Sequence, residues 1–230
     1  MIKLRNMIVA VIAITSISIV SHADIGFGVT GSFATVEASG SDRDKTATAD
    51  TSTRTGTASN VNALVGSVFA EYITEGGWAL GIDYVPGAAD VSGKARVRNT
   101  QTENVKEAKQ EDGNYTANAE IKNYLSLYAD IPVGGSGMYG KIGYVQVDVD
   151  SKESFSGTSA STGFGNDSTD GYMFGAGYKS DLGPNSYYKL EGSHTMFDTM
   201  TFVGVDTDKG TDITADFDVT KITFALGYKF

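Results

Sequence analysis

The sequence contains no cysteine, and only 3 of its 230 residues are proline. Without cysteine, disulfide bonds, thiolate metal sites, iron–sulfur clusters and cysteine nucleophiles are excluded. Basic residues are also scarce, since 18 Lys and Arg stand against 28 Asp and Glu and give a net charge of −10. Nucleic acid is therefore not an expected partner, because binding a polyphosphate needs a basic surface.

A long apolar run occurs only at the amino-terminal end. Lys3 and Arg5 precede an apolar stretch over residues 7–20, and Ser21, His22 and Ala23 follow it. This order is typical of a secretory signal peptide over residues 1–23. A retained membrane anchor is the alternative, but about 14 apolar residues fall short of the roughly 20 that a spanning helix needs. We expect a mature chain of residues 24–230, forming one domain in a bacterial envelope.

The remaining sequence is rich in glycine, tyrosine and phenylalanine, with 28, 12 and 11 residues in the whole chain. Helical periodicity is absent after residue 24, whereas alternation with a period of two recurs and predicts strands with two different faces. Most of these segments are long enough for a tilted strand to cross a bilayer. Eight are found, at residues 25–37, 61–74, 77–88, 115–132, 137–149, 171–182, 186–202 and 215–230.

The connections between these segments alternate in length. Three are short and rich in glycine, at residues 75–77, 133–136 and 183–185. Four are long and polar, at residues 38–60, 89–114, 150–170 and 203–214. Short turns on one rim and long loops on the other are typical of outer-membrane barrels. We therefore predict an all-β fold, an eight-stranded antiparallel up-and-down transmembrane β-barrel with four extracellular loops.

The two faces of the strands distinguish a membrane barrel from a soluble one, because only the membrane barrel is apolar outside. In the last segment the apolar residues Ile222, Phe224 and Leu226 alternate with Lys221, Thr223 and similar small or cationic residues. The segment at residues 77–88 shows the same alternation. The sequence therefore predicts a lipid-facing exterior and a polar lumen.

Two segments depart from strict alternation. In the fourth, Ile121 shares the apolar face with Leu125, so that Glu120 and Lys122 are predicted to face the lumen, but Asn123 interrupts the apolar face. The fifth changes phase after Tyr144, which predicts a β-bulge there.

Two short motifs resemble those of a known family. Residues 225–230, Ala-Leu-Gly-Tyr-Lys-Phe, resemble the closing strand of outer-membrane β-barrels. Residues 188–191, Tyr-Lys-Leu-Glu, resemble the seventh strand of outer membrane protein A and opacity-type barrels, in which the glutamate faces the lumen. The chain ends at Phe230, so the peptidoglycan-binding domain of outer membrane protein A is not expected. The resemblance implies recognition by the barrel assembly machinery and periplasmic chaperones, with an assembly signal made of Phe224, Leu226, Tyr228 and Phe230.

The predicted inward faces collect ten charged side chains. Buried charges persist only when they are paired or hydrated, so opposite charges in a narrow tube predict a crosslinked polar plug. A gated path for ions or protons is the sharper alternative. We expect Glu191 to pair with Lys179, Lys221 or Lys229. The ten residues of this predicted lumen charge network are Glu71, Asp83, Glu120, Lys122, Lys141, Lys179, Lys189, Glu191, Lys221 and Lys229.

Motifs for catalysis and metal binding fail on inspection. His194 is predicted on the outer face, and in the lipid A deacylases, which this chain resembles in size, a nucleophilic serine follows the histidine by two residues, where this chain has Met196. Residues 206–212 are similar to a calcium loop, but the glycine is one place early and no glutamate stands at the twelfth position. We expect no catalytic residue, no metal and no cofactor.

Three functions are consistent with these patterns. The first is a non-enzymatic outer-membrane barrel that displays surface loops, with a role in envelope integrity or adhesion. The second is a small pore for ions or small solutes, and the third is a lipid A-modifying enzyme. The expected neighbours are outer-membrane lipid and lipopolysaccharide, around a monomer whose extracellular ligand the residues do not identify.

Overall fold

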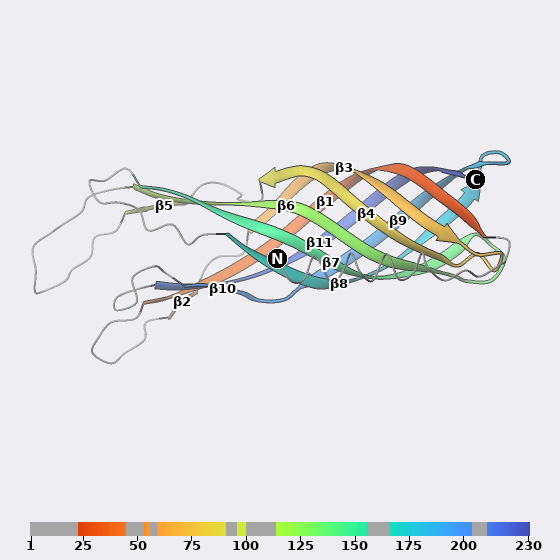
Figure 1. Cartoon of the computed structure of the whole chain (residues 1–230). Coiled ribbons are helices and arrows are strands. Elements are labelled where there is room, and N and C mark those ends of the chain that lie inside the picture. The colour runs from red at the N-terminus through yellow and green to blue at the C-terminus, as the bar shows by residue number, and fades with distance from the viewer. Residues whose placement is uncertain are drawn as a thin grey trace, which may run out of the picture.

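In a computed structural model, the chain forms a closed antiparallel β-barrel with tilted strands (Figure 1). The structure describes residues 23–44, 53–55, 59–90, 96–99, 114–155, 166–203 and 211–230. The predicted signal peptide therefore lies outside the described residues, apart from Ala23. No helix in these ranges has the length and apolar character needed to span a bilayer.

Eight strands form the barrel wall, as the sequence predicts. Three short strands, β2 (Thr53–Thr55), β5 (Arg96–Asn99) and β10 (Met200–Val203), pair with β1, β6 and β11 of the wall. Around the barrel the wall strands follow in the order β1 (Asp24–Asp44), β3 (Ser59–Ile73), β4 (Ala79–Asp90), β6 (Asn114–Pro132), β7 (Met138–Phe155), β8 (Asn166–Asp181), β9 (Ser186–Phe197) and β11 (Thr211–Lys229).

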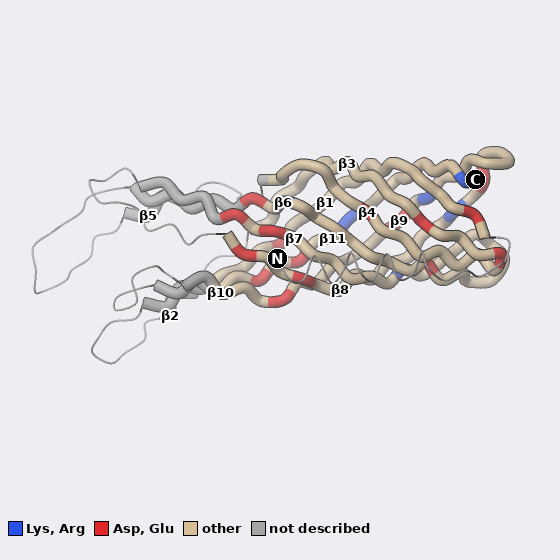
Figure 2. The backbone as a smooth tube through the Cα atoms, viewed as in Figure 1, with Lys and Arg blue, Asp and Glu red and all other residues tan. Residues whose placement is uncertain are grey.

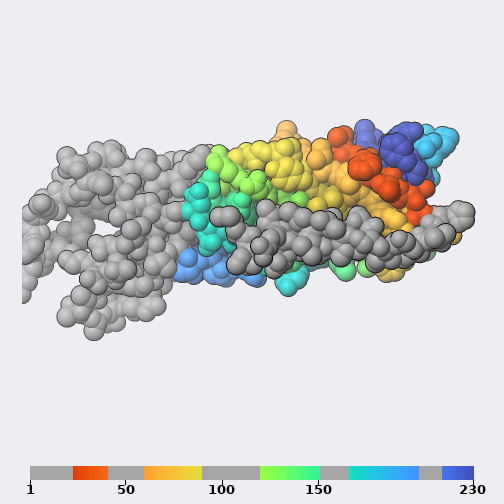
Figure 3. Space-filling model, in the orientation of Figure 1, coloured from red at the N-terminus to blue at the C-terminus, as the bar shows by residue number. Residues whose placement is uncertain are grey.

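Pairing of the last strand with the first closes the wall. The ladder between β1 and β11 runs from Gly26 opposite Lys229 to Asp44 opposite Thr211. Figure 3 shows the start of the barrel, in red, beside its end, in dark blue. A bilayer interior offers no hydrogen-bond partners to an unpaired strand edge, so closure is what allows these strands to cross it.

The three short turns lie together at one end of the barrel. In each, a backbone N–H donates across the turn to a carbonyl: Thr74 to Trp78 (2.9 Å), Val133 to Met138 (2.8 Å) and Leu182 to Ser186 (2.8 Å). The long connections leave from the opposite end, hereafter the loop end. There β1 and β11, with β2 and β10, form one protruding ribbon, and β6 and β7, with β5, form a second (Figure 1). Most of the predicted loop residues lie outside the described ranges.

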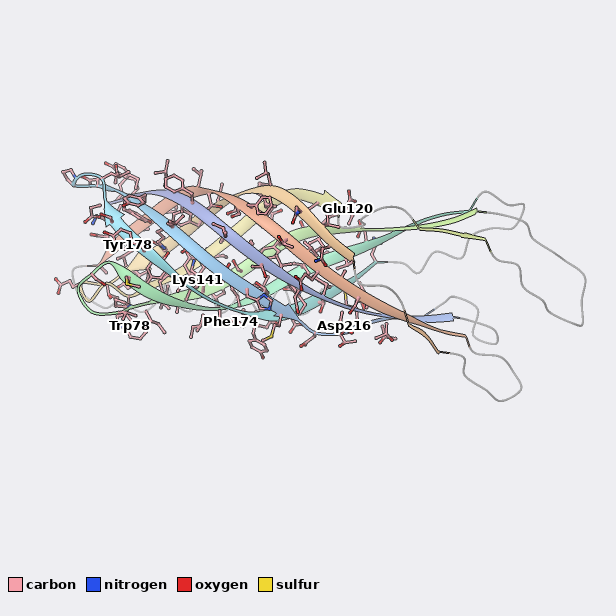
Figure 4. All side chains as sticks on the ribbon, turned by 180° about the vertical axis from the view of Figure 1, so that it is seen from behind. Trp78, Glu120, Lys141, Phe174, Tyr178 and Asp216 are labelled. Atoms are coloured by element: carbon pink, nitrogen blue, oxygen red, sulfur yellow. The ribbon has the colours of Figure 1, made fainter. Side chains whose placement is uncertain are left out.

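Outward side chains form an apolar belt around the barrel. On β11 the belt covers residues 222–230, and on β1 it covers residues 25–33, in each case nine residues with alternate members exposed. Nine residues match the length that a tilted strand needs to cross a bilayer. Exposed aromatic side chains mark the margins, with Trp78 and Tyr178 toward the short turns (Figure 4) and Tyr84 and Tyr172 toward the loop end. The belt therefore has the pattern of a lipid-facing surface.

A β-bulge at Asn123 changes the phase of β6. Asn123 has a φ of 52°, and the pairing with β7 shifts between Lys122 and Leu125. Because of this shift, Ile121 is buried in the lumen together with Tyr124. The predictions that Ile121 faces outward and that Glu120 and Lys122 face inward are therefore wrong.

The bulge predicted in the fifth segment is also wrong. Strand β7 pairs with β8 without a shift from Met138 to Asp150. The apparent change of phase arises only because the surroundings of both strand faces change beyond Tyr144. Beyond Tyr144 the outward face leaves the apolar belt, while the inward Val145 and Val147 enter a buried apolar cluster.

Lumenal aromatic rings lie over glycines of the neighbouring strand. A Cβ added at Gly81 would lie 2.2 Å from Cζ of Tyr128, and one added at Gly227 would lie 2.2 Å from Cζ of Tyr187. These glycines leave the space that the rings fill across the tube. Four such pairs stand directly opposite each other in the ladders: Gly28 with Phe69, Gly81 with Tyr128, Gly177 with Tyr139 and Gly227 with Tyr187.

We predict that Gly81→Val destabilises the barrel by about 1–3 kcal/mol, because the added side chain collides with the Tyr128 ring in a filled lumen. The matched control is Gly192→Val, since a Cβ at Gly192 meets nothing within 4 Å. Urea unfolding of the refolded barrels in detergent micelles measures both. Equal unfolding midpoints for the two variants would contradict the close packing of Tyr128 on Gly81.

Candidate functional site

The lumen is the candidate functional site, and a network of buried charges fills its half nearer the short turns. Glu71 on β3 is the most connected member. Its carboxylate accepts hydrogen bonds from the hydroxyls of Tyr128 (3.0 Å) and Tyr187 (2.8 Å). The same carboxylate contacts Nζ of Lys189 and lies 3.6 Å from Nζ of Lys179. Glu71 thus joins strands from opposite sides of the tube.

Lys189 and Lys141 extend the network to two further carboxylates. Nζ of Lys189 lies 2.7 Å from Oδ2 of Asp130. Nζ of Lys141 lies 3.5 Å from Oδ1 of Asp130 and 2.6 Å from Oε1 of Glu191. Asp130 and Lys189 are only 3% and 2% exposed, so these charges are held by one another rather than by bulk water. The arrangement crosslinks β3, β6, β7, β8 and β9.

Glu191 has a different partner from those predicted, which were Lys179, Lys221 and Lys229. It contacts Lys141 and accepts a 2.5 Å hydrogen bond from the hydroxyl of Tyr139, both on β7. The reason is Gly177, which stands between Glu191 and Tyr139 in the ladders of β8. Because glycine has no side chain, Glu191 reaches across β8 to the strand beyond it.

A second polar group lies further toward the loop end. Ser67 donates a 2.6 Å hydrogen bond to Asp83 and is itself hydrogen-bonded to Thr30. Nζ of Lys221 lies 4.4 Å from the centre of the Tyr124 ring. Asp83 and Lys221 line a cavity of about 30 Å³. A cavity of this size has room for about one water molecule.

Between this cavity and the loop end, the lumen is apolar. The rings of Phe197 and Phe217 stack with their centres 4.4 Å apart, and Tyr124 meets Phe197 edge to face at 6.3 Å. Val145 and Val147 on β7 are fully buried beside them. The tube is therefore filled in two layers, charged toward the short turns and apolar toward the loop end.

The structure places three members of the predicted charge network outside the plug. Lys229 pairs with Asp181 (3.0 Å) at the short-turn rim. Lys122 lies on the outer face near the loop end, where it contacts Glu120 (3.1 Å) and Asp150. Hydrogen bonds to Asp150 and Glu120 raise the pKa of Lys122.

The predicted charge network lacks Asp130. The period-two alternation of β6 places Asp130 on the same lumenal face as Ser126, so the sequence contains the signal for it. With Asp130 included and the three outer residues removed, the described residues in the lumen comprise equal numbers of acids and bases. They are Glu71, Asp83, Asp130 and Glu191, and Lys141, Lys179, Lys189 and Lys221.

His194 lies on the outer face, where the alternation of β9 places it. Its Nδ1 is 2.9 Å from Oγ1 of Thr220, and its ring lies against Phe174 with the centres 5.4 Å apart. The adjacent Ser193 and Thr195 are buried on the lumenal side of the strand. Within the described ranges, no three His, Asp or Glu side chains are grouped so as to hold a metal ion.

We predict that Glu71→Ala lowers barrel stability by about 3–5 kcal/mol, because it leaves Lys189 and Lys179 without their shared carboxylate. The matched control is Asp181→Ala, which removes the exposed rim pair and should cost less than about 1 kcal/mol. Urea unfolding midpoints measure both. Adding Lys189→Met to Glu71→Ala should recover part of the loss, since it restores the balance of acids and bases while Asp130 keeps its contact with Lys141. No recovery, or equal losses at Glu71 and Asp181, would contradict a buried network.

No protein-family model matches the chain, and no curated protein matches its sequence. Among solved structures, the outer membrane protein OprG from Pseudomonas aeruginosa is 18% identical, with 91% of this chain and 98% of that chain covered and a TM-score of 0.45. Neisserial surface protein A is 11% identical, with 86% and 97% covered and a TM-score of 0.33. Ail, the attachment invasion locus protein of Yersinia pestis, is 14% identical, with 90% and 97% covered and a TM-score of 0.32.

Likeness at these identities and scores says nothing about a shared activity. The geometry of the chain itself decides its class. The strands close on themselves, the belt faces outward, and the charges face inward. The predicted fold is thus confirmed. The described strands form an eight-stranded antiparallel up-and-down β-barrel with the apolar outer face of a transmembrane barrel.

Proposed function

We propose that this barrel is a non-enzymatic surface protein, closed to flow along its axis, whose loop end contributes to envelope integrity or adhesion. The observation that carries the proposal is the filling of the lumen by two successive layers. The charged layer around Glu71 leaves room for about one water molecule, and the apolar layer around Phe197 follows it directly. A barrel filled in this way is suited to anchoring surface loops in the membrane and not to conducting solutes.

The loop end supports a role in surface contacts. The two ribbons project beyond the belt on this side, and acidic residues concentrate where the strands leave the barrel (Figure 2). Described examples on the outer side are Asp148, Asp150 and Asp218. Carboxylates at this level suit cationic partners, or lipopolysaccharide phosphates bridged by divalent ions. We propose that the barrel acts as a monomer among these lipids.

An enzymatic role has less support from the site. A lipid A deacylase needs a nucleophile beside its histidine. The hydroxyl contact of His194 is with Thr220 on the outer face, while Ser193 and Thr195 lie on the other side of the strand. The outer face around Phe174 and Met196 is apolar and exposed. We propose that His194 is a lipid-facing residue of the outer surface and not a catalytic base.

The pore alternative is decided by conductance. We predict that the refolded wild-type barrel shows no steady current in planar bilayers, because both layers exclude continuous water. Glu191→Ala should open more often and briefly, since Lys141 loses its 2.6 Å partner. Glu120→Ala, the same change on the outer face, should behave as the wild type. A stable open wild-type channel that Glu191→Ala leaves unchanged would replace this proposal with the small pore.

The surface role is tested by shortening the long connections one at a time. For example, residues 45–58 or residues 100–113 are replaced by a short Gly-Asn turn. We predict that the barrel still folds, because changing the length of a long loop costs little entropy. Adherence to host cells or resistance to large antibiotics should fall. Heat-modifiable migration on gels verifies folding, and unchanged phenotypes in all shortened variants would remove the basis for a surface role.

A further inference from the structure

Strands β3 and β4 separate toward the loop end. Strand β3 pairs with β1 along its whole length, from Ile73 opposite Asp24 to Ser59 opposite Ala38. With β4 it pairs over six residues only, from Ile73 to Val68. Over residues 61–67, the edge of β3 that faces β4 has no strand partner in the described part of the chain. The wall therefore has a lateral gap at this place.

The sequence of β4 explains the separation. Its pairing with β6 shifts between Val85 and Ala88, and the two residues passed over are Pro86 and Gly87. Proline has no N–H to donate to a ladder, and Gly87 has a φ of 101°, which favours glycine. Beyond this bulge β4 continues along β6 and not along β3.

An apolar cavity of about 160 Å³ occupies the gap. From the lumenal side it is lined by Ala34, Val36 and Ile121, among others. From the outer side it is lined by Leu64 and Gly66, whose exposed positions belong to the outer face of β3. Because residues of both faces line one cavity, it reaches through the wall.

The outer mouth of this cavity is continuous with the lipid-facing belt. Leu64 is 86% exposed and stands opposite Phe33, the last apolar residue of the belt on β1. Tyr84, at the last level where β4 still pairs with β3, belongs to the aromatic margin of the belt. The mouth thus lies at the level of the outer leaflet.

The floor of the cavity separates it from the charged layer. Lys221 and Tyr124 are the members of the lining with polar side-chain groups, and Nζ of Lys221 lies over the Tyr124 ring. Lys221 also lines the small polar cavity beneath. An apolar molecule that enters from the side therefore meets an apolar chamber and stops at a cation, above the network around Glu71.

We propose that this lateral chamber binds one small apolar molecule, the size of a single six-membered aromatic ring, which enters from the outer leaflet. The volume supports this size, since an apolar protein cavity of about 150 Å³ stays dry and binds benzene. The belt supports the route, because apolar solutes concentrate in the bilayer and the mouth opens into it. The chamber shares lumenal residues such as Val36 and Ile121 with the apolar layer, but its mouth opens through the wall and not along the barrel axis.

Fluorobenzene is a suitable probe for the refolded full barrel in lipid nanodiscs, observed by ¹⁹F NMR. The wild type should give a bound resonance, or saturation transfer, beyond that of empty nanodiscs. Ala63→Phe, which fills the chamber from β3, should abolish the bound signal or weaken binding at least tenfold. Ala70→Phe is the matched control on the same strand and should bind as the wild type, because Ala70 stands opposite Phe27 on the lipid-facing side.

Three outcomes would overturn the proposal. One is the absence of a bound signal from a folded wild type, and another is equal binding by Ala63→Phe and the wild type. The third is binding in lipid-free detergent that disappears in nanodiscs, which would show that lipid acyl chains fill the chamber instead. None of these results depends on ion conductance or adhesion, so the surface role proposed above stands or falls separately.

Discussion

The structure depends on one constraint: within the bilayer, every backbone N–H and C=O group must find its partner in the protein. The ladder between β1 and β11 meets it by closing the wall, and the long ladder between β7 and β8, which has no register shift, maintains it. The gap between β3 and β4 relaxes the constraint, as do the bulges in β4 and β6. The gap begins in the outer part of the belt, at the level of Thr30, and continues beyond it to the level of Val36.

Closure with eight strands then determines what the lumen can hold. A tube of this size has room for its own side chains and little else. Here rings from one strand lie over glycines of the next, so that Tyr128 and Tyr187 reach the middle of the tube and donate to Glu71. In the part of the chain that the structure describes, four acids and four bases share this space. Their equal number matters because each unpaired buried charge would cost several kcal/mol.

The sequence predicts the strands and their faces well because a period of two is a local property. It fails where the geometry is not local. At Asn123, one residue with positive φ reverses the faces of the preceding part of β6. The alternation shows an interruption at Asn123, but it does not show that the faces reverse there. The partner of Glu191 depends on Gly177 in the strand between, hence on the register of two ladders at once. The gap at Pro86 and Gly87 left a visible signal, but the length of unpaired β3 edge follows only from the paired structure.

Filling along the axis and opening at the side are compatible because the lumen changes character along its length. In the proposed closed barrel, water and ions entering from either end meet either the apolar Phe197 layer or the paired charges around Lys189. An apolar solute prefers the apolar regions and avoids the charged ones. It is stable in the belt and in the chamber beside Val36 and Ile121, and it is excluded from the charges below Lys221. In this proposal, the charged layer closes the axis and at the same time forms the floor of the lateral chamber.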